Sequence, residues 1–231
     1  MGRKQTLRMG GDLREYPRYS IEEAAAYLRI PVSTLKSWTR GYYRSYRHGD
    51  RRHYPAIIKL ADPARGLLSF FNLAEAYVLR FARNQNVSLK RIRLAMEYIR
   101  ERWSDERPLL HRYLATTRGG SVFIRELGLL VNASQHGQYG MELILKNHMR
   151  GIKRGPDGLP AELQPFAHKH ISINPAYSSG EPIVTGTGIM VSILVSRKIA
   201  GDDPDAIARD YGIDRETIEQ AVKAYRHRKA A

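Results

Sequence analysis

The first hydrophobic residues of the chain recur at the spacing of an amphipathic helix. Ser20 offers a hydroxyl at the start of the pattern and Glu23 follows three residues later, which is the signature of a capping box. One apolar helix face is formed by Ile21, Ala24, Ala25 and Leu28. The pattern therefore predicts a helix that begins after Ser20 and ends before the Ile-Pro-Val break at residues 30–32.

A second short helix is predicted directly after this break. Ser33 can cap it, and Leu35 and Trp38 would anchor it in a core. Two short helices across a tight turn form a helix-turn-helix, although an ordinary corner between two core helices has the same spacing. The second helix would offer a DNA groove short polar and basic side chains, namely Ser33, Thr34, Lys36, Ser37 and Arg40.

Residues 41–54 alternate four arginines with four tyrosines around Gly and Asp. Such a run is often a solvated loop. Beside a helix-turn-helix, we interpret it as a basic loop that lies against phosphates, with the Tyr hydroxyls as further donors. The arginines expected to contact DNA are Arg44, Arg47, Arg51 and Arg52.

Two strand-like pieces follow at residues 57–60 and 67–70, with a turn signal at residues 62–66 between them. This pattern predicts a hairpin, and a hairpin after a helix-turn-helix is a wing. Asn72 and Glu75 then form a second capping box, which predicts a helix as far as about Arg83.

A longer helix is predicted from Ser88 to Trp103. Its apolar stripe comprises Leu89, Ile92, Met96, Ile99 and Trp103. We expect this stripe to pack either on the winged domain or on a second copy of the chain. The second possibility would make it the seam of a dimer.

The rest of the chain reads as a β-containing middle and a helical end. The middle is predicted to hold a short hairpin, a helix and a turn between strand-like pieces, at residues 121–131, 140–149 and 153–160. The end is predicted to hold a strand, a glycine-rich loop and three helices, at residues 171–173, 180–188, 189–200, 204–211 and 214–228. Three short helices with a tight second turn form a homeodomain-like bundle.

These elements predict an α+β, mostly helical fold. Its expected parts are a flexible basic arm, a winged helix-turn-helix DNA-binding domain, a β-containing connector and a C-terminal homeodomain-like helix-turn-helix domain, over residues 1–17, 18–105, 106–170 and 171–231.

Charge is distributed unevenly along the 231 residues. Residues 1–60 hold 13 basic and 5 acidic residues, residues 61–170 hold 17 and 10, and residues 171–231 hold 8 and 8, so the net charges are +8, +7 and zero. A basic field attracts phosphate, which is the sequence-independent part of nucleic-acid affinity. The first two-thirds are therefore expected to bind nucleic acid, and the electrically balanced end is expected to contact a protein.

The sequence shows no constellation typical of an enzyme. It lacks cysteine, a His-Glu-x-x-His motif, a phosphate-binding Lys loop and a nucleophile elbow. The loop at residues 180–188 is interpreted as a tight structural turn, since Pro182 has no N–H for a phosphate. His168 and His170 have no third ligand beside them. We therefore expect no catalytic residues, no cofactor and no metal site.

No apolar run approaches the roughly eighteen residues of a membrane span. No signal-peptide pattern is present either, and the absence of cysteine suits a reducing compartment. We expect a cytoplasmic protein without membrane contact.

Two stretches resemble known families. Residues 20–38 are similar to the MerR-type helix-turn-helix, and Arg52-His53-Tyr54 resembles the wing motif of that family. The stretch from Ile173 resembles a small domain of unknown function, number 433, through its Gly-x-Pro-x-Ile/Val-x-Gly-Thr loop at residues 180–187. That family often has Arg where this chain has Gly188, so no role of the arginine is carried over.

The two units together resemble antitoxins of the VapB type, whose partners are PIN-domain ribonuclease toxins. Residues 68–76 and 137–138 also resemble a longer form of these antitoxins. The resemblance implies toxin neutralisation by direct binding and repression of the chain's own operon. A two-fold promoter site would require a homodimer.

The basic end of the chain is the candidate toxin-binding segment. Arg226, Arg228 and Lys229 could reach the acidic Mg²⁺ site of a PIN-domain toxin, and basic side chains near those carboxylates would compete with the metal. Three alternatives stay open. The first is a MerR-like regulator that responds to a small ligand without a toxin partner, and the second is a toxin-binding adaptor with a degenerate helix-turn-helix. The third, ranked last, is a nucleic-acid enzyme whose motif the sequence does not reveal.

Overall fold

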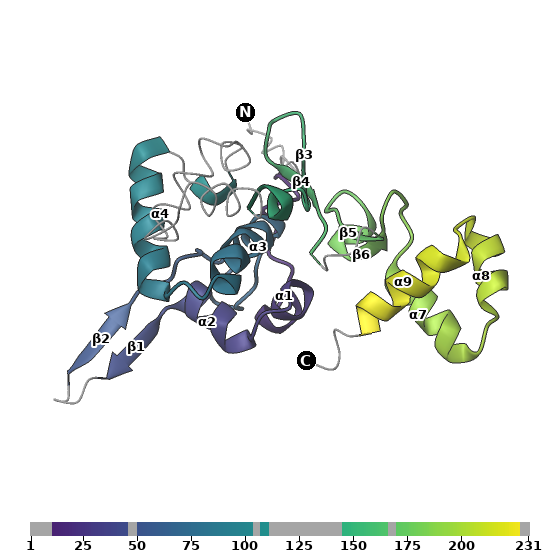
Figure 1. The fold of residues 1–231 in the computed structure, drawn as a ribbon, viewed down its shortest axis with the longest axis horizontal. Helices are drawn as coiled ribbons and strands as arrows, with labels where there is room; N and C mark the ends of the chain where they lie inside the picture. Colours follow the sequence, from purple (N-terminus) through teal and green to yellow (C-terminus); the bar gives the residue numbers. More distant parts are fainter. Residues whose placement is uncertain (1–10, 46–49, 104–106, 111–144, 166–169, 227–231) are drawn as a thin grey trace, which may run out of the picture.

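The computed structural model describes residues 11–45, 50–103, 107–110, 145–165 and 170–226. It confirms the expected α+β fold. The molecule is elongated (Figure 1): a two-stranded hairpin projects at one end, a helical block and a small sheet lie in the middle, and a three-helix bundle forms the other end. None of the helices within the described ranges is long and apolar enough to cross a membrane.

The helical block contains α1 (Ile21–Leu28), α2 (Val32–Arg40), α3 (Phe70–Asn84) and α4 (Leu89–Trp103). The capping box of α1 is confirmed: the Ser20 hydroxyl accepts from the N–H of Glu23 at 3.1 Å, and the Glu23 carboxylate accepts from the N–H of Ser20 at 3.0 Å. The cap predicted for α2 is wrong, because Pro31 precedes the helix and Ser33 already lies inside it.

Asn72 organises the start of α3 differently from the prediction. The helix is capped by Ser69, whose hydroxyl accepts from the N–H of Asn72 at 3.2 Å, so the capping box is Ser69 with Asn72 and not Asn72 with Glu75. The Asn72 side chain also donates to the carbonyl of Lys59 at 2.9 Å and accepts from the N–H of Ala61 at 3.0 Å. This buried amide therefore holds the segment that precedes α3.

The strands predicted at residues 57–60 and 67–70 are wrong. The backbone N–H groups of Ile57 and Ile58 donate to the carbonyl of Trp38 at 2.7 and 2.9 Å. Together with the contacts of Asn72, these bonds give several backbone polar groups of the segment a partner without a neighbouring strand. Isolated bridges join Asp62 to Leu67 and Tyr19 to Leu68 instead. The wing of the fold lies earlier in the chain.

The apolar stripe of α4 belongs to the internal core. Ile92, Met96 and Ile99 are buried, and Leu89 is partly buried against the same cluster. The Trp103 side chain lies outside the described residues. Of the two expected positions for this stripe, the structure therefore places it within one chain and not between two.

The end of the expected flexible arm packs on the body of the protein. The Arg14 guanidinium lies 2.5 Å from the Asp157 carboxylate and stacks 4.9 Å from the centre of the Phe71 ring. The N–H of Phe71 donates to the Arg14 carbonyl at 3.1 Å. Residues 11–17 are thus not part of a free arm, and residues 1–10 lie outside the described residues.

A four-stranded antiparallel meander follows, with β3 (Ile152–Arg154), β4 (Pro160–Leu163), β5 (Ile171–Ile173) and β6 (Pro182–Val184) in that order. The predicted turn at residues 153–160 and the predicted strand at residues 171–173 are confirmed. Strand β6 was missed, because it lies inside the expected glycine-rich loop. Residues 145–149 are helical, whereas the rest of that predicted helix and the hairpin at residues 121–131 lie outside the described residues.

The C-terminal bundle contains α7 (Val191–Ala200), α8 (Pro204–Tyr211) and α9 (Arg215–Arg226), close to the predicted bounds. Gly201 and Gly212 end the first two helices with φ values of 94° and 62°, a region that favours glycine. The three helices meet around Leu194, Ile207, Ile218 and Val222.

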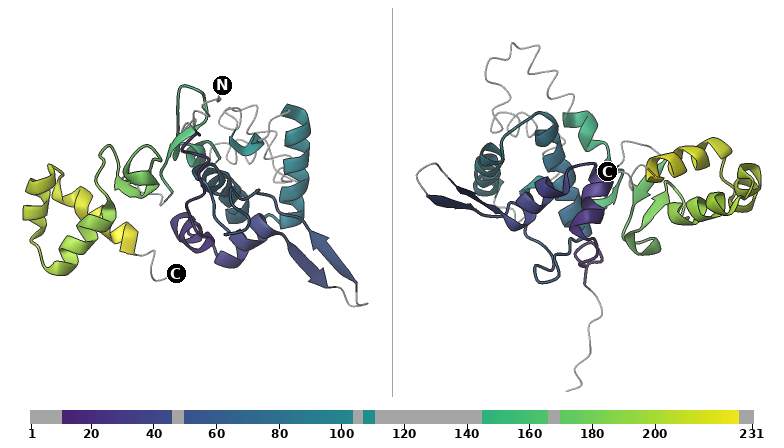
Figure 2. Two further views of the ribbon diagram at one scale, coloured as in Figure 1. Left: turned by 180° about the vertical axis from the view of Figure 1, so that it is seen from behind. Right: turned by 90° about the horizontal axis from the view of Figure 1, so that it is seen from below.

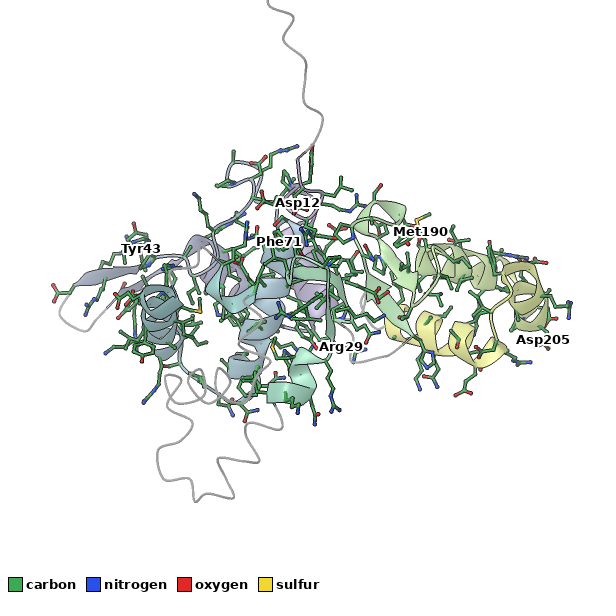
Figure 3. The ribbon with its side chains drawn as sticks, turned by 90° about the horizontal axis from the view of Figure 1, so that it is seen from above. Asp12, Arg29, Tyr43, Phe71, Met190 and Asp205 are labelled. Atoms are coloured by element: carbon green, nitrogen blue, oxygen red, sulfur yellow. The ribbon has the colours of Figure 1, made fainter. Side chains whose placement is uncertain are left out.

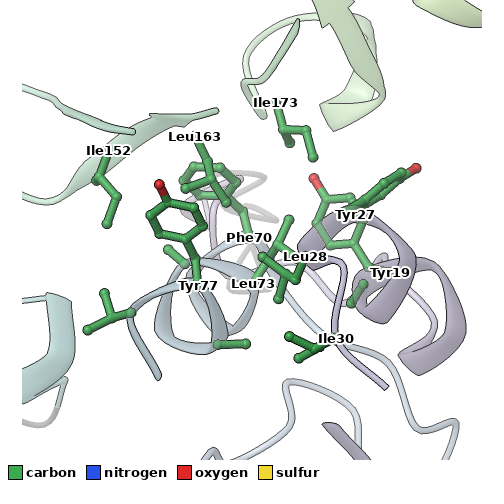
Figure 4. Packing of buried hydrophobic residues seen from close by; sticks show 14 of the residues in the cluster. Tyr19, Tyr27, Leu28, Ile30, Phe70, Leu73, Tyr77, Ile152, Leu163 and Ile173 are labelled. Carbon is green, nitrogen blue, oxygen red and sulfur yellow. The ribbon is translucent and has the colours of Figure 1, made fainter. Parts of the chain in front are cut away.

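The sheet that leads to the C-terminal bundle packs on the helical block, and the buried residues of the two parts form one continuous core (Figure 4). Tyr19 and Tyr27 face Ile173 of β5. The Tyr19 hydroxyl donates to the Gly180 carbonyl at 2.9 Å. Gly180 has a φ of +79°, and a Cβ atom there would lie 2.5 Å from the Tyr19 hydroxyl, so only glycine fits this contact.

His148 and Tyr77 hold the short helix at residues 145–149 against α3. Their rings stack at 4.1 Å, the Tyr77 hydroxyl donates to the His148 carbonyl at 2.9 Å, and His148 Nε2 donates to the Tyr77 carbonyl at 2.7 Å. Burial disfavours the charged imidazole and lowers the pKa of His148 from 6.5 to about 4.

We therefore expect the free energy of unfolding to fall as the pH drops from 6.5 towards 4. In that window the unfolded chain binds a proton that the folded chain refuses. At 1.36 kcal/mol per pKa unit, the difference between 6.5 and about 4 corresponds to a loss of about 3 kcal/mol. Urea unfolding at a series of pH values measures it. His148→Gln should remove this part of the pH dependence, and an unchanged slope in that variant would contradict the assignment to His148.

Candidate nucleic-acid interface

Helix α2 is anchored on one side and polar on the other. Leu35, Trp38 and Thr39 are buried against the helical block, and the Thr39 hydroxyl donates back to the Leu35 carbonyl at 2.8 Å. Of the side chains predicted to contact DNA, Ser33, Lys36 and Arg40 are exposed and Thr34 and Ser37 are half-buried. At 3.6 residues per turn these five side chains cover one continuous face.

Lys36 is the one residue of this face with an ion-pair partner among the described residues. Its Nζ lies 3.0 Å from the Glu22 carboxylate of α1. The hydrogen bond from Lys36 lowers the pKa of Glu22. Both side chains are largely exposed, and exposed pairs contribute about 0–1 kcal/mol, so Lys36 can exchange this carboxylate for a phosphate or a base at little cost.

The hairpin that follows α2 is the wing. Strands β1 (Tyr42–Ser45) and β2 (Arg51–Tyr54) pair in antiparallel register, and the hairpin projects away from the rest of the molecule in both views of Figure 2. Residues 42–45 and 51–54 thus form a basic wing and not a solvated loop. Arg47 lies outside the described residues.

Arginines occupy both faces of this hairpin. Arg44 pairs directly with Arg52, on the same face as Tyr42 and Tyr54, whereas Arg51 lies on the opposite face with Tyr43 and His53. All three arginines are exposed. Both faces of the hairpin therefore offer arginines to phosphates, which is the arrangement of a wing that enters or straddles a groove.

Arg93 of α4 supports the base of the wing. Tyr42 and Tyr54 stack at 4.9 Å with an interplanar angle of 11°, and the Arg93 guanidinium lies 5.1 and 5.5 Å from the two ring centres. Arg93 Nε donates to the Pro55 carbonyl at 2.9 Å. A buried cation under two stacked rings is a favourable cation–π arrangement. The wing is therefore fixed to α4 by a buried arginine, whereas the arginines of the hairpin itself are exposed.

A groove of about 330 Å³ flanks the other side of α2. Ser33, Thr34 and Ser37 form one wall. Arg83 from the last turn of α3 and Ser88 from the start of α4 form the other. The exposed cations around this turn, which the sequence analysis missed, are Arg83, Lys90 and Arg91. They were visible only as the polar faces of two helices. The fold places Arg83 beside α2, so the basic surface extends on both sides of the helix.

The second helix-turn-helix, in the C-terminal bundle, is electrically neutralised. Arg215, in the first turn of α9, lies 3.1 Å from Asp205 and 2.9 Å from Glu219. Arg197 of α7 lies 2.5 Å from Asp202 and 2.7 Å from Asp210. These cations are already bound to carboxylates, and the bundle lies at the opposite end of the molecule from the wing, with Tyr43 and Asp205 far apart (Figure 3).

The glycine-rich loop is a closed structural turn. The Thr187 hydroxyl donates to the Val184 carbonyl at 2.9 Å and accepts from the N–H of Ile189 at 3.1 Å, while the Ser178 hydroxyl donates to the Gly188 carbonyl at 2.9 Å. These bonds occupy two hydroxyls and one backbone N–H of the loop in contacts within the loop itself. The described ranges contain no cluster of three or more His, Asp or Glu side chains that could hold a metal ion.

The expected toxin-binding residues cannot be placed. The side chain of Arg226 and the whole of Arg228 and Lys229 lie outside the described residues, as does His168. His170 is described, and its Nδ1 lies 3.3 Å from the Thr217 hydroxyl of α9.

Comparison with known proteins agrees with this division of the chain. Residues 17–96 match the family described as "Putative DNA-binding HTH domain". The match covers α1, α2, the wing and α3, so the expected N-terminal helix-turn-helix is confirmed. Residues 171–225 match the family "Protein of unknown function (DUF433)", which confirms the second resemblance.

Two relatives that align with this chain over about nine-tenths of their length occur in Mycobacterium tuberculosis. The chain is 28% identical over 229 residues to "Putative antitoxin VapB45", covering 91% of this chain and 94% of the relative. It is 25% identical over 221 residues to "Uncharacterized protein Rv2308", covering 90% and 91%. The crystal structure of Rv2018 from the same organism superposes with a TM-score of 0.67 at 21% identity, covering 90% of this chain and 98% of that chain, and shows the same fold.

Proposed function

We propose that this protein is an antitoxin that represses its own operon and neutralises a PIN-domain ribonuclease toxin by direct binding. It would act in the cytoplasm, as a homodimer, and without catalytic activity or a cofactor of its own. The observation that carries the proposal is a helix-turn-helix with an arginine-bearing wing, within a chain that resembles an antitoxin over nine-tenths of its length.

The DNA-binding part of the proposal rests on three adjoining features. Helix α2 presents polar and basic side chains, the hairpin presents arginines on both faces, and Arg83 lies across the groove on the far side of α2. In such an arrangement the helix reads base edges in the major groove, and the flanking cations hold the phosphates that fix its register.

The toxin-binding part rests on charge and position. The chain carries 8 basic and 8 acidic residues from residue 171 onwards, and two arginines of the bundle, Arg197 and Arg215, are paired with carboxylates. A neutral bundle far from the wing is better suited to a protein than to DNA. PIN-domain identity of the toxin is supported only by the resemblance to VapB-type antitoxins.

Alanine in place of Arg44, Arg51 or Arg52 should weaken binding to the chain's own promoter and to other DNA alike. Each lost phosphate contact should lower the slope of log K against log [salt] by about one unit. Lys36→Ala should instead change which promoter bases are preferred. Titrations by fluorescence anisotropy at several salt concentrations measure both effects.

Lys198→Ala is the matched control for these titrations, because Lys198 is an exposed cation on α7 at the other end of the molecule. It should leave affinity and salt slope unchanged. Absence of promoter binding by the wild-type protein at about 50 mM salt, with or without toxin, would refute the DNA-binding role.

A further inference from the structure

Helix α4 has a second stripe, on the side away from its buried face. Ile92, Met96 and Ile99 point into the core, whereas Leu94 and Tyr98 are 55% and 36% exposed. Arg91 and Glu101 are exposed at either end of the same stripe. Two large apolar side chains at the centre of an exposed helix face, bordered by charges, are the composition of a contact surface.

The spacing of this exposed stripe is that of a helix that packs on another helix. Arg91, Leu94, Tyr98 and Glu101 follow each other at intervals of three, four and three residues. Alternating intervals of three and four keep side chains on one face along a helix–helix seam. The stripe is about 15 Å long, at 1.5 Å per residue.

The two end charges are not used within the helix. The residues three and four positions from Arg91 are Ser88, Val87, Leu94 and Ala95, none of which is acidic. Glu97 and Tyr98 lie four and three residues before Glu101, so the preceding turn of the helix places a second carboxylate near Glu101 and no cation. Neither Arg91 nor Glu101 forms an ion pair within the described part of the chain.

We propose that this stripe is the seam at which a second copy of the chain binds, with the two α4 helices antiparallel. A two-fold axis near Met96 would set Leu94 against the partner's Tyr98 and Arg91 against the partner's Glu101. Each contact then occurs twice, as an isologous interface requires. The biological role of this dimer rests on the proposed function, because a two-fold promoter site requires two copies of α2.

The charges of this face favour a second copy of the chain over DNA or a toxin as its partner. The exposed charges of α4 are mixed, with Lys90 and Arg91 near one end and Glu97, Arg100 and Glu101 near the other, so the helix does not offer the uniformly basic surface that DNA phosphates favour. A toxin surface could be of any charge. The stripe, however, runs from a cation through two apolar residues to an anion, so an antiparallel copy of the same stripe matches it charge for charge. Such self-complementarity is the feature expected of a homodimer.

Charge reversal tests the seam on the full chain by sedimentation equilibrium, without DNA or toxin. Arg91→Glu should weaken the dimer by about tenfold or more, because it places two carboxylates opposite each other at both ends of the seam. Glu101→Arg should do the same. The double variant Arg91→Glu/Glu101→Arg should restore the dimer, because the two opposite charges have then only exchanged places and still attract each other across the seam.

Two controls separate a lost seam from a damaged fold. Lys198→Glu reverses an exposed charge on α7 and should leave the dimer unchanged. Circular dichroism should show native helix content in every variant, and Leu94→Glu should give folded monomers if Arg91→Glu proves unstable. A monomeric wild-type chain, or single reversals that leave the dimer intact, would overturn the seam. Promoter binding by the wild-type protein would still stand in that case, so the two proposals can fail separately.

Discussion

The combined substitution Ile92→Glu and Ile99→Glu is expected to unfold the protein. Both side chains are 0% exposed and belong to the hydrophobic core. An uncompensated buried carboxylate costs several kcal/mol, and two of them approach the 5–15 kcal/mol that stabilise a typical domain. Far-ultraviolet circular dichroism at 25 °C should show loss of helix and of a cooperative thermal transition.

Leu94→Glu is the control for this experiment, because it introduces the same side chain on the same helix at a position that is 55% exposed. It should leave the fold intact and act only on the proposed seam. If the double core variant instead stayed folded and became monomeric, the buried stripe would be the dimer contact and the placement of α4 in the core would be wrong.

Ending the chain after Gly188 is expected to abolish toxin inhibition while operator binding is largely kept. The cut removes α7, α8 and α9 but leaves β5, β6 and the Tyr19–Gly180 contact in place. A cut at residue 170 would also remove Ile173 from the core of the helical block (Figure 4) and would confuse loss of binding with loss of fold.

The two activities are measured on the same preparation, by inhibition of the toxin ribonuclease and by promoter titration. Operator affinity should stay within about threefold of the full chain, because distant sites act independently. Loss of promoter binding with full toxin inhibition would reverse the assignment of the two ends. The full chain serves as the reference in both assays.

Local patterns in the sequence were sufficient for the helices and for the solvent exposure of most side chains that are predicted to contact DNA. Ser20 with Glu23, and the glycines after α7 and α8, are short-range signals whose meaning depends little on the rest of the fold. The same holds for the exposed face of α2, because helical periodicity alone separates Leu35 and Trp38 from Lys36 and Arg40.

The errors came from contacts between distant segments. Residues 57–60 look like a strand because Ile57, Ile58 and Leu60 are apolar, but they are apolar in order to fill the core beside Trp38 and Asn72. Residues 41–54 look like a loop because charges dominate, whereas tyrosines pair across the hairpin and Arg93, forty residues later, supports them. The groove beside Arg83 also required the packing of α3 against α2.

The contact between Tyr19 and Gly180 limits how such chains can recombine. A C-terminal domain transplanted from a relative would need glycine at this position, and a recipient helix-turn-helix would need a side chain that ends in a donor where Tyr19 stands. Arg18 and Glu181, 3.0 Å apart, add a second matched pair beside it. Exchange of whole domains between related chains should therefore succeed only when the residues on both sides of this contact are exchanged together or are already compatible.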